Sequence, residues 1–202
     1  MSWPRTRNRC IGVGSSKRDF LSFPAGVKED MGNALGVARF GGTAPTAKPW
    51  KGLGPGVLEI VESHDGNAYR AVYTVRFEKA VRGITRSTMA SRNAERRESV
   101  TRGTGNVFAD LGFPDAAERQ AKLRLAYALN QVLEERKLSQ ADTAKVLGVT
   151  QPKVSALRHY KLAGFSVERL MNLLTAVDQD VEIVIRRKPR SRKAGRISVV
   201  AA

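Results

Sequence analysis

The segment Leu138–Lys161 constrains the fold of this chain more than any other stretch, because its pattern predicts two short helices joined by a tight turn. Ser139 is a favourable N-cap, and Asp142 follows three residues later, where its carboxylate can reach back to a free backbone N–H. Gly148 stands where the first helix must end, since glycine adopts a left-handed conformation without strain. Thr150 is placed to cap the second helix.

The remaining positions of this segment fit two helices that cross. Pro152 falls in the first turn of the second helix, where backbone N–H groups lack helical partners anyway. Ala144 provides a small side chain where the helices approach each other. Apolar residues are spaced to point inward together: Leu147, Val149, Val154 and Leu157. The pattern predicts a helix-turn-helix. The alternative is a helical hairpin that only packs against the rest of the chain.

The outward face of the second helix carries side chains that suit DNA. Glutamine can bond adenine through two hydrogen bonds, lysine and arginine can bond guanine or phosphate, and serine can serve either role. We predict contacts to base edges from three residues, Gln151, Lys153 and Ser155. Contacts to phosphates are predicted from Gln140, Arg158, His159 and Lys161.

The segment resembles the phage-repressor and Cro type (XRE) of helix-turn-helix through Gln140, Ala144, Gly148, Gln151, Val154, Ser155 and Leu157. The resemblance implies dimers that place two such helices in successive major grooves of a pseudo-palindromic operator. Thr143 departs from the family, which usually has an aliphatic residue there, and this predicts a slightly looser first helix.

Charge supports a polyanionic partner. The 202 residues carry a formal net charge of +16, and nucleic acid is the usual partner of such a chain. No apolar run approaches the ~20 residues that a membrane-spanning helix needs, and the N-terminus lacks the apolar core of a secretion signal. One cysteine, Cys10, and two distant histidines, His64 and His159, make a metal site improbable. We expect a cytoplasmic protein without a cofactor.

The N-terminal region predicts a small α+β unit. Ser16 with Asp19 marks the start of a short helix that Pro24 ends, and the following apolar positions are spaced for a second helix that ends at Gly41-Gly42. Two strands are then predicted at 57–62 and 69–77, joined by a hairpin around Asp65-Gly66. Along the second strand, Tyr69, Ala71, Tyr73, Val75 and Phe77 alternate with Arg70, Val72, Thr74 and Arg76.

Three stretches, GSSKRDFLSFP, AKPWKGLGPGVLEIVE and YRAVYTVRF, resemble the N-terminal two-thirds of HigB/RelE-like toxins of phage-derived type, over about residues 11–81. Such toxins cut mRNA on the ribosome without a metal, using basic and aromatic side chains. The matching candidates for RNA contact are Lys51, Arg70, Tyr73 and Arg76. The family's closing strand, basic motif and helix are absent, so we predict an inactive remnant in which these four are ordinary sheet residues.

We predict a basic linker at residues 82–104, because this stretch has six arginines from Arg82 to Arg102 and no periodic apolar pattern. From Val100 onward, TRGTGNVFADLGFPDAAERQ resembles the opening of HigA-like antitoxins, and Met89 stands where an independent start could lie. The hypothesis is a truncated toxin reading frame joined to its neighbouring antitoxin, whether naturally or as a reading-frame artefact. We place the helix-turn-helix domain at 105–187 and a basic tail at 188–202.

Three further elements are predicted in this C-terminal half. Asp115 with Glu118 forms a capping box for a long helix, and Ser166 opens another. Asp180–Arg187 alternates Val181, Ile183 and Ile185 inward as a strand, which pairs either with a second copy across a two-fold axis or with the N-terminal hairpin. The tail is either an arm that tracks phosphates or a solvated segment.

Together these features predict an α+β chain with a partial RelE-like module followed by an all-α, lambda-repressor-like domain. Its expected function is sequence-specific binding of double-stranded DNA, as a homodimeric repressor and antitoxin of a type II toxin-antitoxin system. The alternatives are a self-neutralised ribonuclease and a protein that binds nucleic acid through charge alone. The remnant could also bind an antitoxin segment, in cis around Gly105–Leu111 or in trans from an intact locus.

Overall fold

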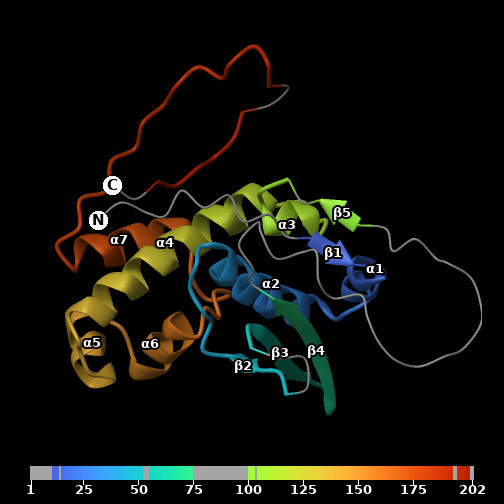
Figure 1. Cartoon of the computed structure of the whole chain (residues 1–202). Coiled ribbons are helices and arrows are strands. Elements are labelled where there is room, and N and C mark those ends of the chain that lie inside the picture. Colours follow the sequence, from blue (N-terminus) through green and yellow to red (C-terminus); the bar gives the residue numbers. More distant parts are fainter. Residues whose placement is uncertain are drawn as a thin grey trace, which may run out of the picture.

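A computed structural model describes residues 11–13, 15–51, 55–74, 100–102, 104–192 and 195–200 (Figure 1). The helices and strands follow the order β1 Ile11–Val13, α1 Ser16–Leu21, α2 Ala25–Arg39, β2 Ala47–Pro49, β3 Val57–His64, β4 Asn67–Thr74, β5 Val100–Arg102, α3 Val107–Asp110, α4 Ala116–Glu135, α5 Gln140–Leu147, α6 Gln151–Arg158 and α7 Val167–Thr175. The architecture is mixed α+β, as predicted, with helices and an antiparallel sheet first and a helical region with a helix-turn-helix after them. The sheet has a third strand, β2, beside the predicted two-stranded hairpin.

The three-stranded sheet has the order β2-β3-β4, and all neighbours are antiparallel. The predicted hairpin is confirmed: His64 pairs with Asn67, and the two residues between them, Asp65 and Gly66, have φ values of 48° and 77°. Positive φ at both central positions matches the twist of the strands, which is why Asp-Gly is favoured there. Along β4, Tyr69, Ala71 and Tyr73 are half-buried and their neighbours are exposed, as the alternation predicts.

The helix termini follow the predicted signals with three differences. One is Thr150, which stands at the N-cap of α6 as predicted but whose side chain makes no capping hydrogen bond. Ser166 caps α7, its hydroxyl accepting from the N–H of Arg169 at 3.1 Å. At α1 the cap is Ser15 rather than Ser16. The capping box predicted at Asp115 is wrong, because this carboxylate accepts from Nε of Arg119 at 2.7 Å instead of from the backbone. The charged guanidinium is the stronger donor.

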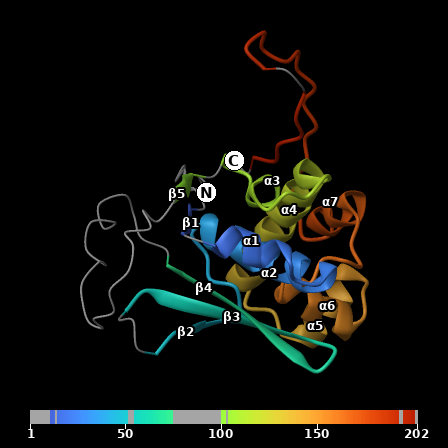
Figure 2. The ribbon, with the colours of Figure 1, turned by 90° about the vertical axis from the view of Figure 1, so that its right-hand side faces the viewer.

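Helix α2 joins the two parts of the chain. Figures 1 and 2 both show it between the sheet and α4. One face packs on β3, and the other packs on α3 and α4. Gly36 permits the close approach, since a Cβ there would lie 2.2 Å from Cδ2 of Leu123. A single hydrophobic core therefore includes residues of both parts, such as Met31 and Ile60 with Phe108 and Leu129.

The predicted strand at Asp180–Arg187 is wrong for the single chain. These residues form no regular secondary structure after α7, and no strand among the described residues pairs with them. Val181 packs partly against the core, whereas Ile183 and Ile185 are 73% and 93% exposed. An isolated strand without a partner has no ladder of hydrogen bonds to hold it. Pairing with the N-terminal hairpin is excluded for the described residues.

Other predictions fall at the edges of the described chain. Residues 100–102, inside the predicted linker, form β5, which pairs antiparallel with β1. Arg76, Val75 and Phe77, together with Cys10 and Met89, lie outside the described residues. None of the helices that the structure describes has the length and apolarity needed to cross a bilayer.

Candidate DNA interface

Helix α5 begins and ends as its sequence predicts. The Ser139 hydroxyl accepts from the N–H of Asp142 at 3.1 Å and donates to the Asp142 carboxylate at 2.6 Å. At the other end, Gly148 has a φ of 60°, and the N–H of Val149 donates to the carbonyl of Ala144. These two caps fix both termini of the first helix and aim the chain into the second.

Thr143, the departure from the family pattern, ties the two helices together rather than loosening the first. Its side chain is fully buried, and its hydroxyl donates to the Ser139 carbonyl at 2.7 Å. Nη2 of Arg158 donates to the Thr143 hydroxyl at 3.2 Å and to the Leu138 carbonyl at 2.8 Å. The hydroxyl is therefore satisfied in the core, and burial costs little free energy.

Helix α6 packs against the core through buried side chains. Val154 and Leu157 are buried, as predicted, and Val149 packs partly against the same core. Nδ2 of Asn130, itself buried on α4, donates to the Leu157 carbonyl at 3.0 Å. The long helix thus supports the second helix both by packing and by a buried hydrogen bond.

The exposed side of the motif forms an open, shallow groove of about 670 Å³ between α5, α6 and α7. The side chains around it are mostly small or basic: Ala141, Ala144, Lys145, Gly148, Val149, Thr150, Gln151, Lys153 and Arg169. Lys145 and Arg169 were not predicted as site residues. Lys145 could have been recognised as an exposed cation on α5. Arg169 comes to the groove through the packing of α7 on α4, which no local spacing indicates.

The three residues predicted to contact bases lie on α6 in different environments. Gln151 is exposed in the first turn, and Ser155 is half-buried one turn later. Lys153 is turned toward the loop after α6, where its Nζ donates to the Gly164 carbonyl at 3.1 Å and lies 5.2 Å from the centre of the Phe165 ring. A contact between Lys153 and a base edge would require this flexible side chain to leave the loop.

The predicted phosphate contacts are partly engaged within the protein. Nε2 of Gln140 donates to the Gln151 carbonyl at 3.0 Å, which ties together the starts of α5 and α6. Arg158 makes the two bonds described above. His159 is exposed, with Nδ1 2.8 Å from the Ser155 carbonyl. Gln140 and His159 are exposed, whereas Arg158 is half-buried.

Lys161, the fourth predicted phosphate contact, is paired with the N-terminal part of the chain. Its Nζ lies 3.3 Å from a carboxylate oxygen of Asp30 and 3.4 Å from one of Glu62. Partial burial alone would lower the pKa of Lys161, but the two carboxylates outweigh it and hold the pKa above its ordinary value. Lys161 stays charged, and its charge is already balanced in the free protein.

The residues expected to contact RNA are not gathered into a site. Lys51 is exposed after β2, and Arg70 pairs with Glu59 at 3.0 Å across the hairpin. The Tyr73 hydroxyl is buried without a hydrogen-bond partner, and burial raises its pKa. Arg76 lies outside the described residues. Arg70 and Tyr73 lie on opposite faces of β4, so these two side chains do not share a face.

Comparison with known proteins assigns the two parts of the chain separately. Residues 18–84 match the family described as phage-derived protein Gp49-like, and residues 107–186 match a helix-turn-helix domain family. A solved structure, provisionally named an XRE family transcriptional regulator, is 75% identical; the match covers 44% of this chain and 100% of that chain, with a TM-score of 0.43. No curated protein matches the chain. The predicted order, a toxin-like part followed by an XRE-type helix-turn-helix, is confirmed at this level.

Proposed function

We propose that this chain, whose residues 107–186 match a helix-turn-helix domain family, is a transcriptional repressor that recognises its operator through Gln151 at the start of α6. The observation that carries the proposal is the groove, in which Gln151 stands exposed among Lys145, Lys153 and Arg169. In this motif the first residues of the second helix contact base edges, and flanking cations hold phosphates.

The proposal extends to the type of system. The Gp49-like part ahead of the helix-turn-helix supports a type II toxin-antitoxin origin, with HigB-like and HigA-like halves joined in one chain. The functional unit would be a homodimer on a pseudo-palindromic operator. The exposed apolar residues Ile183, Val184 and Ile185 support pairing of this segment with a second copy.

The test is binding of the purified chain to DNA from its own upstream region and to scrambled DNA of the same composition, at about 150 mM salt, where affinity from charge alone is weak. Gln151→Ala should cost about 1–3 kcal/mol on the upstream DNA and less on the scrambled DNA. Gln131→Ala makes the same substitution on α4, outside the groove, and should leave both affinities unchanged. Equal binding of both DNAs by the native chain would refute sequence-specific recognition.

The same proposal holds the toxin-like part to be inactive as a ribonuclease, supported by the buried Tyr73 hydroxyl and the Arg70–Glu59 pair. Purified protein added to translating ribosomes should leave the mRNA intact. Cleavage that disappears on Arg70→Ala and on Lys51→Ala would establish the ribonuclease function instead.

A further inference from the structure

The chain leaves α6 through a corner at Tyr160 that has an unusual backbone conformation. Tyr160 has a φ of 56°, a left-handed conformation that residues other than glycine rarely adopt. Its side chain is only 5% exposed and stacks on Tyr127, with the ring centroids 6.4 Å apart. Such a conformation persists only where the surroundings hold it in place.

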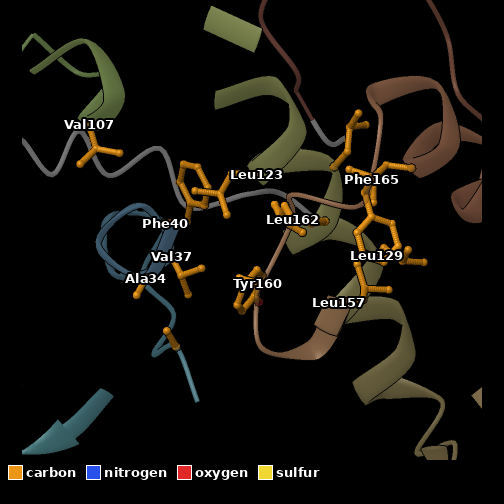
Figure 3. Close-up of a cluster of buried hydrophobic side chains, with 14 of the residues drawn as sticks. Ala34, Val37, Phe40, Val107, Leu123, Leu129, Leu157, Tyr160, Leu162 and Phe165 are labelled. Carbon is orange, nitrogen blue, oxygen red and sulfur yellow. The ribbon is translucent and has the colours of Figure 1, made fainter. Parts of the chain in front are cut away.

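Two buried amides hold this corner from opposite sides. Asn130 of α4 donates to the Leu157 carbonyl at 3.0 Å, on the last turn of α6. Asn33 of α2, 4% exposed, donates from Nδ2 to the Tyr160 carbonyl itself at 2.9 Å. Figure 3 shows Tyr160 between Val37 on the α2 side and Leu157 and Leu129 on the other. The N-terminal part of the chain therefore supplies half of the support for the corner.

The residue after the corner is held by the same part. Lys161 lies between Asp30 on α2 and Glu62 on β3, and the Glu62 side chain is only 10% exposed. A partly buried pair of carboxylates around one ammonium group is held more firmly than a surface ion pair, because less water screens it. Two successive residues after α6 thus bond to the toxin-like part.

We infer that the toxin-like part positions the DNA-binding helix α6. It fixes the end of this helix through Asn33 and the Asp30–Lys161–Glu62 cluster. This inference rests on the proposed function, and it assigns these residues a role in DNA affinity without any contact to DNA. Loss of the Asn33 bond leaves the Tyr160 carbonyl buried and unpaired, which releases the corner and lets α6 shift relative to α5.

The experiment compares two variants of the full chain. Asn33→Ala removes the bond to the corner, whereas Ile60→Ala removes a fully buried side chain from β3 and leaves that bond in place. Asn33→Ala should bind operator DNA about tenfold more weakly, within the range typical of coupled sites, with unchanged binding to scrambled DNA. Ile60→Ala should lower the thermal unfolding temperature and keep the operator affinity within about twofold. Ile60→Val replaces it if the alanine variant does not fold.

Unchanged operator affinity in Asn33→Ala, or equal losses in both variants, would overturn the inference.

Amide hydrogen exchange provides a readout that needs no DNA. The N–H groups of Tyr160 and Lys161, which donate to the carbonyls of Leu157 and Ala156, should exchange about tenfold faster in Asn33→Ala than in Ile60→Ala. If the native chain does not discriminate operator from scrambled DNA, the proposed function fails. Unchanged exchange at these two amides would overturn the positioning role on its own.

Discussion

At the scale of single residues, Tyr160 links the stability of the chain to pH. Burial raises the pKa of its hydroxyl to about 12, against 10.0 for an exposed tyrosine. Between these two values the unfolded chain has lost the phenolic proton and the folded chain still holds it, so the folded state loses stability as pH rises. At pH 12 the loss from this group is about 2 kcal/mol.

Tyr160→Phe removes this contribution. Urea unfolding of the native chain and of the variant, measured at pH 9 and at pH 12, should show that raising the pH costs the native chain about 2 kcal/mol more than the variant. Contributions from the other ionisable groups are present in both proteins and cancel in the comparison. The same pH dependence in both proteins would show that the Tyr160 hydroxyl is not buried.

Arg158 and Arg169 are both arginines of the DNA-binding part, but the structure separates their roles. Arg158 donates to the Leu138 carbonyl and the Thr143 hydroxyl, whereas Arg169 is an exposed residue at the groove. Arg158→Met should lower the free energy of unfolding by about 1–3 kcal/mol, because two partly buried acceptors lose a charged donor. Arg169→Met should change stability by less than about 0.5 kcal/mol and weaken operator binding. Thermal melts and DNA titrations of both variants test this, and the reverse assignment would contradict it.

At the scale of elements, the turn between α5 and α6 depends on the backbone of Gly148. No atom lies within 4 Å of a Cβ added there, so substitution meets no steric obstacle and its cost is conformational alone. Gly148→Ala should destabilise the chain by about 1–2 kcal/mol, the cost of a left-handed conformation with a Cβ. Gly148→Asn should lose less, because asparagine tolerates this region. Equal losses, measured by urea unfolding, would point to packing instead.

The elements that the sequence predicts well are those specified by neighbouring residues. Ser139 and Gly148 define α5, and Asp65-Gly66 defines the hairpin, because caps and turn residues act over a few positions. Asp115 is the N-cap residue of α4, but its side chain makes no capping bond because Arg119, one turn away, binds its carboxylate. Asp180–Arg187 failed because alternation predicts a strand without supplying its partner.

Local sequence patterns could not predict the contacts between residues far apart in the chain. Asn33 and Tyr160 are separated by 127 positions, and nothing in the spacing of α2 distinguishes Asn33 from an ordinary polar residue. Gly32 and Gly36 are residues that normally destabilise a helix, yet the absence of a side chain at Gly36 makes room for the Leu123 side chain. The DNA-binding motif could therefore be predicted from sequence, whereas its support by the N-terminal part required the structure.

At the scale of the whole molecule, Gly36 sets how closely the two parts pack. Alanine in a helix interior normally stabilises by about 0.5–1 kcal/mol relative to glycine. Gly26→Ala, in the first turn of the same helix with open space around it, should not destabilise the chain. Gly36→Ala should instead destabilise by about 1–3 kcal/mol through overpacking against the buried Leu123. Addition of Leu123→Ala should cost less in the Gly36→Ala background than in the native chain. Urea unfolding of the four proteins measures this coupling, and additive losses would contradict it.

The shared core also predicts how the chain unfolds. Because α2 buries one face on the sheet and the other on α3 and α4, neither part can open without exposing apolar surface of the other. In a Trp3→Phe background, fluorescence reports Trp50 beside the sheet, while far-ultraviolet circular dichroism is dominated by the helices. The two unfolding curves should coincide as a single transition, and Gly36→Ala should shift both together. A fluorescence transition that precedes the loss of helix would show that the toxin-like part unfolds separately, which a shared core does not permit.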